Sequence, residues 1–257
     1  MNVLYTGAAS GIAKEVICNL KDDKSVFWYL TVHTDKQLIH VKKQYQKNKN
    51  IAVMKLDITN LEDYHQLDYL DIDVVIHNAA VGFGGSLFDM SIDKVKENYE
   101  TNVFGTLRLT QYLFLKFQKQ KHGRMIFMSS LASILPISFI GSYASSKASL
   151  VMIAKTLQRE TKLLGFPLDI IVIEPGLYHT GFNQLLFESK KMRNDCFQLQ
   201  KERIEKKEKL LLFLEKKNLN SIVKQISRAI YEPYPLSIYR APLFQSIGAK
   251  LYQILFW

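Results

Sequence analysis

The chain has 257 residues, of which 47% are hydrophobic, and it carries a formal net charge of +10. That size allows one sizeable core, and no stretch rich in proline, glycine or serine divides the chain, so we expect a single domain over residues 1–257. Two cysteines far apart exclude a disulfide framework and a paired-cysteine metal site, and the absence of an apolar run of about eighteen residues excludes a membrane-spanning helix. Because acidic residues are interleaved with the lysines, the charge is typical of solvated helix faces and not of a nucleic-acid-binding surface.

Strand-like and helix-like segments alternate along the chain. Short apolar runs rich in β-branched and aromatic residues predict strands at 3–6, 26–32, 51–56, 72–77, 124–129 and 169–173. Helical periodicity predicts helices at 11–20, 35–46, 98–119 and 143–164. This alternation predicts an α/β fold, a doubly wound parallel sheet with helices on both faces, in which ligands bind beyond the carboxyl ends of the strands. The first strand leaves no room for a signal peptide, so we expect a cytoplasmic protein.

A glycine-containing turn, "TGAASGIAKEV", follows the first predicted strand. Glycine at positions 7 and 11 lets the backbone turn tightly and lets a pyrophosphate approach the amides at a helix N-terminus, and the small Ala13 lets the helix pack closely on the strand. With Thr6 before it, the turn resembles that of the short-chain dehydrogenase/reductase family, and the resemblance extends to about residue 182. The family has a Rossmann-type sheet, and the resemblance places Thr6, Gly7, Ser10, Gly11 and Ile12 at a nicotinamide dinucleotide.

Three further motifs at strand ends are similar to cofactor-binding elements of this family. "KLDIT" implies an adenine contact at Asp57 and Ile58, and "HNAA" matches the family's Asn-Ala-Gly element at Asn78, Ala79 and Ala80. In "EPGLYHTGF", the resemblance implies that Pro175 and Gly176 pass close to the nicotinamide and that Thr180 hydrogen-bonds its carboxamide. His77 departs from the family's commonest residue, and we interpret it as a structural histidine at a strand end.

The motif "GSYASSK" places Tyr143 and Lys147 one helical turn apart. Spacing alone does not make this pair catalytic, because Tyr45 with Lys49 and Tyr112 with Lys116 repeat it. Ser130 lies thirteen residues before Tyr143, and Asn102 lies twenty-eight before Ser130. Both intervals are those of the family's catalytic tetrad. Neither Tyr45 nor Tyr112 has a serine thirteen positions earlier.

The resemblance implies a role for each member of this tetrad. Tyr143 exchanges a proton with the substrate oxygen, and Ser130 hydrogen-bonds the same oxygen. Lys147 lowers the pKa of the phenol and holds the nicotinamide ribose, while Asn102 connects it through water to solvent.

The end of the second predicted strand favours NADP as the cofactor. The best alignment puts Val32 in the place of the family's ribose-binding acid and His33 where NADP users often carry arginine. Asp35 would be that acid if the alignment were shifted, so NAD stays an alternative. We interpret Asp35 as a helix N-cap.

The later part of the chain is expected to form the substrate side of the molecule. Segment 181–217 is long, charged and amphipathic, as a substrate lid would be. Segment 241–257 is an amphipathic extension that docks on the body, mediates contacts between copies or lies on a membrane surface. Family members commonly pair helices across a homodimer or homotetramer interface, for which 151–157 is a candidate, with burial inside the monomer as an equal alternative. The expected apolar pocket is formed by Phe83, Leu131, Ile134, Pro136, Phe139, Tyr178 and Phe182.

Together these motifs predict an NAD(P)-dependent oxidoreductase that transfers hydride between nicotinamide and a carbonyl or secondary alcohol, with a hydrophobic small molecule as substrate. A non-catalytic NADP-binding sensor or scaffold is the first alternative, although the tetrad is intact. A sugar-nucleotide epimerase or dehydratase is the second, since "HNAA" is faintly similar to that branch. We expect no metal site.

Overall fold

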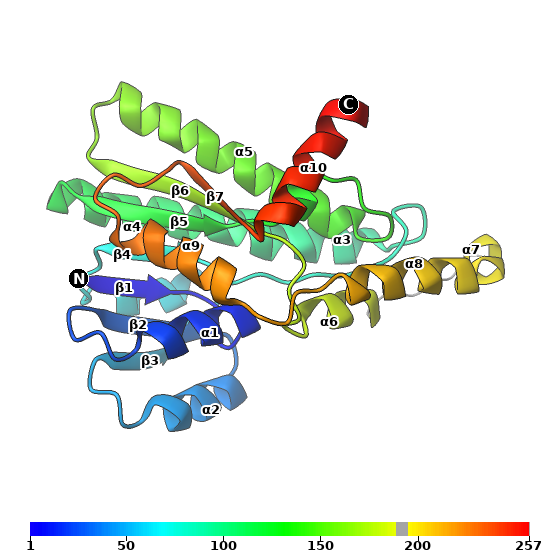
Figure 1. Ribbon diagram of the computed structural model, residues 1–257. Coiled ribbons are helices and arrows are strands. Elements are labelled where there is room, and N and C mark those ends of the chain that lie inside the picture. The colour runs from blue at the N-terminus through cyan, green and yellow to red at the C-terminus, as the bar shows by residue number, and fades with distance from the viewer. Residues whose placement is uncertain (189–194, 257) are drawn as a thin grey trace.

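The protein is described by a computed structural model that covers residues 1–188 and 195–256 (Figure 1). Its centre is a seven-stranded sheet in the order β3-β2-β1-β4-β5-β6-β7, and every neighbouring pair is parallel. The strands are β1 Asn2–Tyr5, β2 Phe27–Val32, β3 Ile51–Lys55, β4 Val74–His77, β5 Gly123–Met128, β6 Leu168–Pro175 and β7 Ile238–Ala241. The predicted doubly wound parallel sheet is therefore confirmed.

Helices cover both faces of this sheet. They are α1 Gly11–Leu20, α2 Asp35–Tyr45, η1 Leu61–Leu67, α3 Ile92–Tyr99, η2 Glu100–Gly105, α4 Thr106–Gln120, η3 Leu131–Ser133, α5 Gly141–Leu163, α6 Phe182–Glu188, α7 Asp195–Leu199, α8 Lys201–Phe213, α9 Asn220–Tyr231 and α10 Leu243–Phe256. Residues of α1, α2 and α9 share one apolar cluster with the sheet, whereas residues of η1, α4 and α5 share a second cluster on the opposite face. In Figure 1, α1 and α9 lie in front of the sheet and α4 lies behind it.

The strands are apolar on both sides because both faces are covered. In β1, Val3 and Tyr5 belong to the first cluster and Leu4 to the second, and all three are fully buried. Such a strand has no polar face to expose, which explains the continuous hydrophobic runs in the sequence. The carboxyl ends of the strands meet at the side of the molecule from which α6, α8 and α10 extend (Figure 1).

Three local details differ from the sequence-based expectations. The helix predicted over 98–119 is divided, since η2 is a π-helical turn between α3 and α4. Strand β7 was not predicted. The N-cap of α2 is Thr34, whose hydroxyl accepts a hydrogen bond from Gln37 N, and not Asp35, which pairs with Lys55 Nζ at 2.8 Å. The prediction of Asp35 as the cap was wrong by one position.

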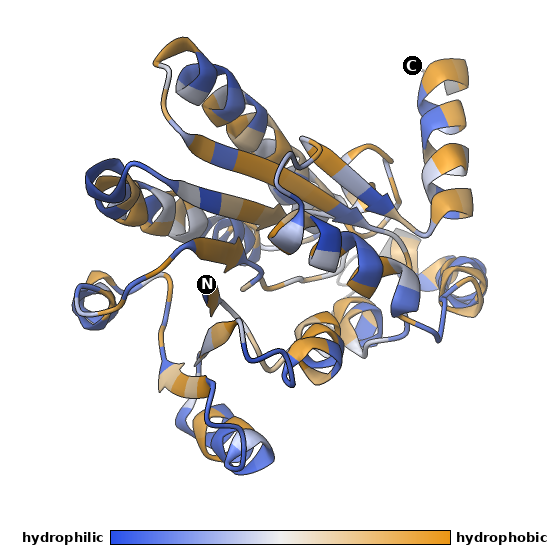
Figure 2. Cartoon of the chain, turned by 60° about the vertical axis from the view of Figure 1, so that its left-hand side comes forward, coloured by the Kyte–Doolittle hydropathy of each residue, from blue (hydrophilic) through white to orange (hydrophobic). Residues whose placement is uncertain are grey.

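Helix α10 is attached to the body along one side only. Ser246 and Ala249 are buried, and the side chain of Gln245 accepts a hydrogen bond from Leu177 N at 2.7 Å and donates one to Leu214 O at 3.1 Å. Its outer face is apolar and exposed, and much of this helix, next to the label C, is coloured as hydrophobic in Figure 2. The exposed apolar residues are Leu243, Phe244, Ile247, Leu251, Ile254 and Leu255. None of the helices in the described ranges is long and apolar enough to cross a bilayer.

Candidate active site

The turn after β1 has the geometry of an anion-binding loop. Gly7 has a φ of +65°, and a Cβ there would lie 2.8 Å from the Cα of Ala79. A Cβ on Gly11 would lie 2.6 Å from the Cβ of Thr180. Ser10 caps α1, because its hydroxyl accepts a hydrogen bond from Ala13 N at 3.4 Å. Both glycines are thus required by space, and the turn directs the N-terminus of α1 toward the carboxyl edge of the sheet.

Asn78 and Thr6 join the ends of β1 and β4. Asn78 Nδ2 donates hydrogen bonds to the carbonyl oxygens of Thr6 and Gly7 at 2.9 and 3.0 Å. The Thr6 hydroxyl accepts hydrogen bonds from the backbone N–H groups of Asn78 and Ala79 and donates to Ile76 O. Thr6 is 1% exposed. It therefore shapes the turn from below and does not line the cavity above it.

A cavity of about 610 Å³ opens above this turn at the carboxyl ends of the strands. All but two of the predicted site residues line it, the exceptions being Thr6 and Asn102. The predicted residues that do are Gly7, Ser10, Gly11, Ile12, His33, Asp57, Ile58, Asn78, Ala79, Ala80, Ser130, Tyr143, Lys147, Pro175, Gly176 and Thr180. Residues from six different strand ends and from α5 thus face one space.

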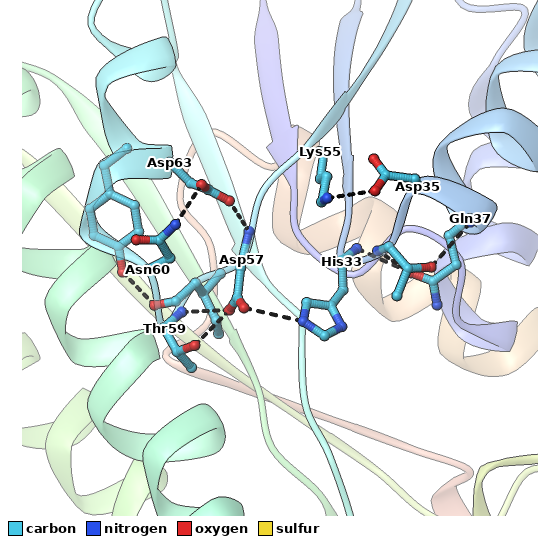
Figure 3. A network of polar contacts seen from close by, with 11 residues as sticks. His33, Asp35, Gln37, Lys55, Asp57, Thr59, Asn60 and Asp63 are labelled. Carbon is cyan, nitrogen blue, oxygen red and sulfur yellow. Dashed lines mark hydrogen bonds and ion pairs between the residues drawn. The ribbon is translucent and has the colours of Figure 1, made fainter.

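At one end of the cavity, His33 and Asp57 form a polar network between the ends of β2 and β3 (Figure 3). His33 Nε2 lies 3.1 Å from Asp57 Oδ2. Burial alone would raise the pKa of the Asp57 carboxyl, but hydrogen bonds from Thr59 and the contact with His33 lower that pKa below its usual value. Gln37 fixes the backbone here, since its Oε1 accepts hydrogen bonds from His33 N and Thr34 N. Gln37 also lines the cavity, a placement that sequence reasoning missed.

At the other end of the cavity, Ser130, Tyr143 and Lys147 come together. Tyr143 and Lys147 are 8% and 3% exposed, and Lys147 Nζ lies 5.9 Å from the centroid of the Tyr143 ring. Lys147 Nζ donates a hydrogen bond to Met128 O at 2.8 Å. Ser130 caps η3, its hydroxyl accepting a hydrogen bond from Ala132 N at 3.1 Å.

Burial dominates the electrostatics of this group. It raises the pKa of Tyr143 to about 12, and a hydrogen bond with Ser130 opposes the rise. Burial also lowers the pKa of Lys147 to about 8. Without a ligand, the phenol is therefore protonated at neutral pH and ready to donate a proton. The pKa of Lys147 lies close to neutral pH, so its ammonium readily loses and regains a proton.

Asn102 lies beside this group but outside the cavity. It sits in the π-helical turn η2, is fully buried, and exchanges two hydrogen bonds of 2.9 Å with the backbone of Val81. Its Nδ2 also donates to the Ser146 hydroxyl at 3.0 Å, and that hydroxyl donates to Tyr143 O at 2.7 Å. A π turn re-aims the side chains within it and is frequent at functional sites. Ser146 was missed because small residues around a tyrosine carry no individual signal in a sequence.

The other polar candidates are structural. His77 is fully buried, stacks on Phe127 with ring centroids 4.8 Å apart, and lies 3.3 Å from the Thr110 hydroxyl through Nε2. Burial lowers the pKa of His77 to about 3, so it is neutral. The decoy Tyr112 donates a hydrogen bond to Asp68 Oδ1 at 2.6 Å on the far side of α4. The described residues contain no group of three or more His, Cys, Asp or Glu side chains arranged to hold a metal ion.

The single apolar pocket expected from the sequence is divided in the structure. Tyr178 and Phe182 line the first cavity, whereas Ile134, Pro136 and Phe139 line a second cavity of about 650 Å³. The ring of Phe182 lies 5.3 Å from that of Tyr143, so α6 covers the phenol. Phe83 lines neither cavity and instead packs under Lys94 Nζ at 4.0 Å from its ring centroid.

The residues around the first cavity fit a nicotinamide dinucleotide. The turn at 7–11 has no room for a side chain at Gly7 or Gly11 and offers backbone N–H groups at a helix N-terminus, which suits a pyrophosphate. Asp57 and His33 lie at one end and the hydroxyls of Ser130 and Tyr143 at the other, so the cavity has a polar group for each end of an elongated ligand.

Comparison with known proteins identifies the same relationship. The family described as short chain dehydrogenase matches residues 1–191. The NADP-dependent 3-hydroxy acid dehydrogenase of Schizosaccharomyces pombe is 26% identical over 75% of this chain and 77% of its own length. Retinol dehydrogenase 8 of Bos taurus is 27% identical over 72% of this chain and 62% of its own length. The chain thus spans less than two thirds of the second relative.

Two solved structures share the fold over nearly the whole chain. A short-chain dehydrogenase/reductase of Burkholderia phymatum in complex with NAD has a TM-score of 0.82 at 17% identity and covers 98% of this chain and 92% of its own. The closed form of a serine dehydrogenase complexed with NADP+ has a TM-score of 0.78 at 19% identity and covers 95% of this chain and 96% of its own. At these identities the likeness establishes the fold alone.

Proposed function

The chain belongs to the short-chain dehydrogenase family, whose members are NAD(P)-dependent oxidoreductases acting on CH–OH and C=O groups, and from this premise we propose that it reduces a hydrophobic ketone, or oxidises the matching secondary alcohol, with Ser130, Tyr143 and Lys147 at the reaction centre. The cofactor is NADP, with NAD as the alternative. The relatives differ in the substrates that their names give, among them retinol and 3-ketodihydrosphingosine, so they do not select one substrate.

The main observation behind the proposal is that three polar side chains lie at one end of a cavity that the glycine turn also lines. Ser130, Tyr143 and Lys147 all line the space that Gly7, Gly11 and Asp57 line. A hydroxyl, a phenol and an ammonium in one place, next to a dinucleotide-shaped cradle, suit proton transfer to an oxygen beside a hydride donor.

Each residue has a separate role in the proposed reaction. The reduced nicotinamide supplies a hydride to the carbonyl carbon when bound. The phenol of Tyr143, protonated at neutral pH because burial raises its pKa to about 12, donates its proton to the carbonyl oxygen. The Ser130 hydroxyl hydrogen-bonds the same oxygen and fixes its position. The Lys147 ammonium favours the phenolate that the proton transfer leaves behind, and Asn102 connects this group to solvent through water.

The test combines cofactor binding with turnover. Titration with NADPH and NADH is followed by oxidation of the bound cofactor over a panel of ketones. Tyr143→Phe is expected to keep cofactor affinity within about twofold and to lower turnover by about a hundredfold or more, the usual contribution of a general acid. The matched control is Tyr112→Phe, which changes the tyrosine of a decoy pair with the same spacing and should leave turnover unchanged. Equal losses in both variants would contradict the assignment.

The same experiment separates the alternatives. A non-catalytic NADP-binding sensor would bind NADPH tightly and oxidise it with no carbonyl of the panel. The four tetrad residues are present, and Tyr143 and Lys147 are buried beside Ser130, which favours the enzyme. A sugar-nucleotide epimerase would return its cofactor unchanged and convert a nucleotide sugar.

Segment 181–217 is proposed as the substrate lid of a single domain, and its residues 189–194 lie outside the described residues. Its base is fastened by the carboxylate of Glu215, whose side chain is 2% exposed. Glu215 lies 2.8 Å from His179 Nδ1 and accepts hydrogen bonds from Asn183 and Gln184 of α6 at 2.7 and 2.9 Å. These contacts join α6, the loop after β6 and the end of α8. A moving lid would turn about these contacts of Glu215.

A homodimer or homotetramer is part of the proposal. Val151 is 7% exposed and, with Leu157, packs in the core cluster behind the sheet, so these two residues fit the alternative of burial inside the monomer. Helices α4 and α5 expose Leu115 and Met152, and the π-helical turn η2 before α4 exposes Phe104, which supports an apolar contact between copies. Light scattering of the purified protein, with Met152→Glu as the variant, tests it.

We also propose that the protein is cytoplasmic, which agrees with the free thiol of Cys18. We further propose that α10 makes peripheral contact with an anionic membrane surface. The outer face of α10 is apolar, and the adjoining end of α8 and the residues after it expose Lys209, Lys216 and Lys217, a combination that suits an interfacial helix. Sedimentation with phosphatidylglycerol-containing vesicles, weakened by salt and by Leu251→Glu, is the expected result. Equal sedimentation of wild type and variant would contradict the contact.

A further inference from the structure

The second cavity is an apolar groove on the other side of the first turns of α5. The groove has a volume of about 650 Å³. Its walls are mainly aliphatic and aromatic, including Leu87, Leu135, Ile137, Phe139 and Phe197. Of the described residues, no aspartate, glutamate, lysine or arginine lines it. A space of this kind receives hydrocarbon and excludes charged or strongly hydrated groups.

The groove lies next to the reaction centre. Ala132 lines it two residues after Ser130, and Ala144 lines it directly after Tyr143. Both alanines belong to the same buried apolar cluster as Tyr143. Successive residues of a helix point about 100° apart, so Tyr143 and Lys147 face the first cavity while Ala144 and Ala148 face the groove. At Ala132 and Ala144, the wall between the two spaces is made of small side chains.

Helix α6 completes the partition between the two spaces. Its Phe182 rests on the ring of Tyr143, and its Leu186 rests on the glycine-rich loop after β4, where a Cβ on Gly84 would lie 2.2 Å from Leu186 O. The same Cβ would lie 3.3 Å from the carbonyl oxygen of Phe139, a groove residue. A substrate that extends from Tyr143 into the groove would therefore pass the ring of Phe182.

The far wall of the groove is held in a fixed position. Phe139 has a φ of +66°, and its carbonyl oxygen accepts a hydrogen bond from Gly85 N at 2.7 Å. This bond ties the loop before α5 to the loop after β4, so the groove is bounded on two sides by loops that are fastened to each other. Along α5 it extends from Gly141 to Ala148, a length of about 10 Å.

We propose that this groove binds the aliphatic tail of the substrate, so that the substrate is a long-chain ketone or secondary alcohol whose oxygen lies at Ser130 and Tyr143 and whose hydrocarbon chain passes over Ala132 and Ala144. This inference rests on the proposed function for the position of the oxygen, and the groove itself defines the class of the remainder. A compact polar ketone would leave the groove unused. An unbranched chain fills it without placing a charge in it.

The experiment uses a homologous series of ketones, from 2-butanone to 2-decanone, with NADPH and the full-length protein. Burial of each methylene is expected to raise kcat/KM by about fourfold, the equivalent of about 0.8 kcal/mol, until the groove is full and the series reaches a plateau. Ala148→Phe fills the end of the groove. It should lower the ratio of kcat/KM for 2-decanone over 2-butanone by about tenfold and move the plateau to a shorter chain.

Two further variants keep this result interpretable. Arg159→Phe adds the same ring to an exposed position about three turns farther along α5 and outside the groove, and should leave the ratio unchanged. Leu135→Asp introduces a charge in the groove and serves if Ala148→Phe fails to fold; it should also lower the ratio. An unchanged ratio in both groove variants overturns the proposal.

Failure of the groove and failure of the proposed reaction give different results. Calorimetric binding of 2-decanone and 2-butanone in the presence of NADP+ requires no turnover. Chain-length-dependent binding that Ala148→Phe weakens, with no reduction of any ketone, would support the groove and contradict the proposed reaction. Turnover of the whole series with no effect of the groove variants would do the reverse. If Ala148→Phe changes the oligomeric mass and lowers activity on all ketones alike, the groove is a contact between copies and the inference is wrong.

Discussion

Asn102 donates a hydrogen bond of 3.0 Å to the hydroxyl of Ser146, 44 positions later in the chain, and so joins the π-helical turn η2 to the helix that carries Tyr143. Ser146→Ala is expected to lower kcat by about fivefold, the equivalent of one neutral hydrogen bond, because the Asn102 amide loses one of its anchors. Cofactor affinity should stay the same. Steady-state kinetics checks it, with Ser149→Ala as the control, because the hydroxyl of Ser149 donates to Ser145 O on the same helix.

The pH dependence of carbonyl reduction should follow Lys147. Burial lowers its pKa to about 8, so the ammonium is present below that pH and is lost above it, while burial keeps Tyr143 protonated to about pH 12. We expect kcat/KM to be level from about pH 6 to 7.5 and to fall about tenfold per unit well above pH 8. Lys147→Met should have a low and flat profile. A wild-type profile that stays level to pH 10 would contradict the role of the ammonium.

His33 should set the preference between the two cofactors. Its side chain is 68% exposed at the end of β2 and lines the cavity, where a 2'-phosphate would need a cation. His33→Arg is expected to lower the KM for NADPH, and His33→Asp to raise it by about tenfold or more without raising the KM for NADH. Asp35→Asn is the control, because Asp35 pairs with Lys55 and does not line the cavity. A change of preference in the control would show that Asp35 is the ribose-binding acid.

Gly7 should tolerate no side chain. Its φ of +65° is costly for any other residue, and a Cβ would lie 2.8 Å from the Cα of Ala79, a backbone atom that cannot move aside. Gly7→Ala is expected to weaken NADPH binding by at least about tenfold, measured by fluorescence titration. Gly165→Ala is the matched control: its φ is +63°, but no atom lies within 4 Å of the added Cβ. The control should lose some stability and keep its affinity, so equal affinity losses would refute the steric explanation.

The added strand β7 brings a buried ion pair into the sheet. Glu174 is fully buried, and Arg240 Nε lies 2.5 Å from its Oε2. Arg240→Met leaves an unpaired buried carboxylate and should lower the free energy of unfolding by about 3 kcal/mol, whereas the double variant with Glu174→Leu should recover most of that loss. Urea denaturation of the wild type and the two variants measures it. A double variant as unstable as Arg240→Met would argue against a charge effect.

Much of the fold could be predicted from the sequence because the strands are apolar on both faces and the turns carry glycine. The intervals from Asn102 to Ser130 and from Ser130 to Tyr143 identified the residues that the structure brings together near one cavity end. The predicted strand ends at Asp57, Asn78 and Pro175 all line that cavity. Alternation of elements fixes which residues reach the carboxyl edge, so a single chain contains enough information to find them.

Three features of the structure could not be predicted from the sequence, each for a physical reason. The π turn at Glu100–Gly105 keeps helical periodicity on both sides, so the extra residue in it leaves no mark in the hydrophobic pattern. Strand β7 has four residues and contains Arg240, whose partner Glu174 lies on another strand. The division of the pocket depends on where Phe182 packs, which is a tertiary contact of α6 and not a property of its local sequence.

The two hydrogen bonds of Gln245 affect how the C-terminal helix can be studied. They fasten the first turn of α10 to the backbone at Leu177, next to Gly176 in the cofactor loop, and to the end of α8 at Leu214. Truncation after Ala241 would remove both hydrogen bonds at once. If the shortened protein then had low activity or did not bind vesicles, loss of the helix and distortion of the cofactor loop could not be told apart. Single replacements on the outward side of the helix leave this brace intact and separate the two causes.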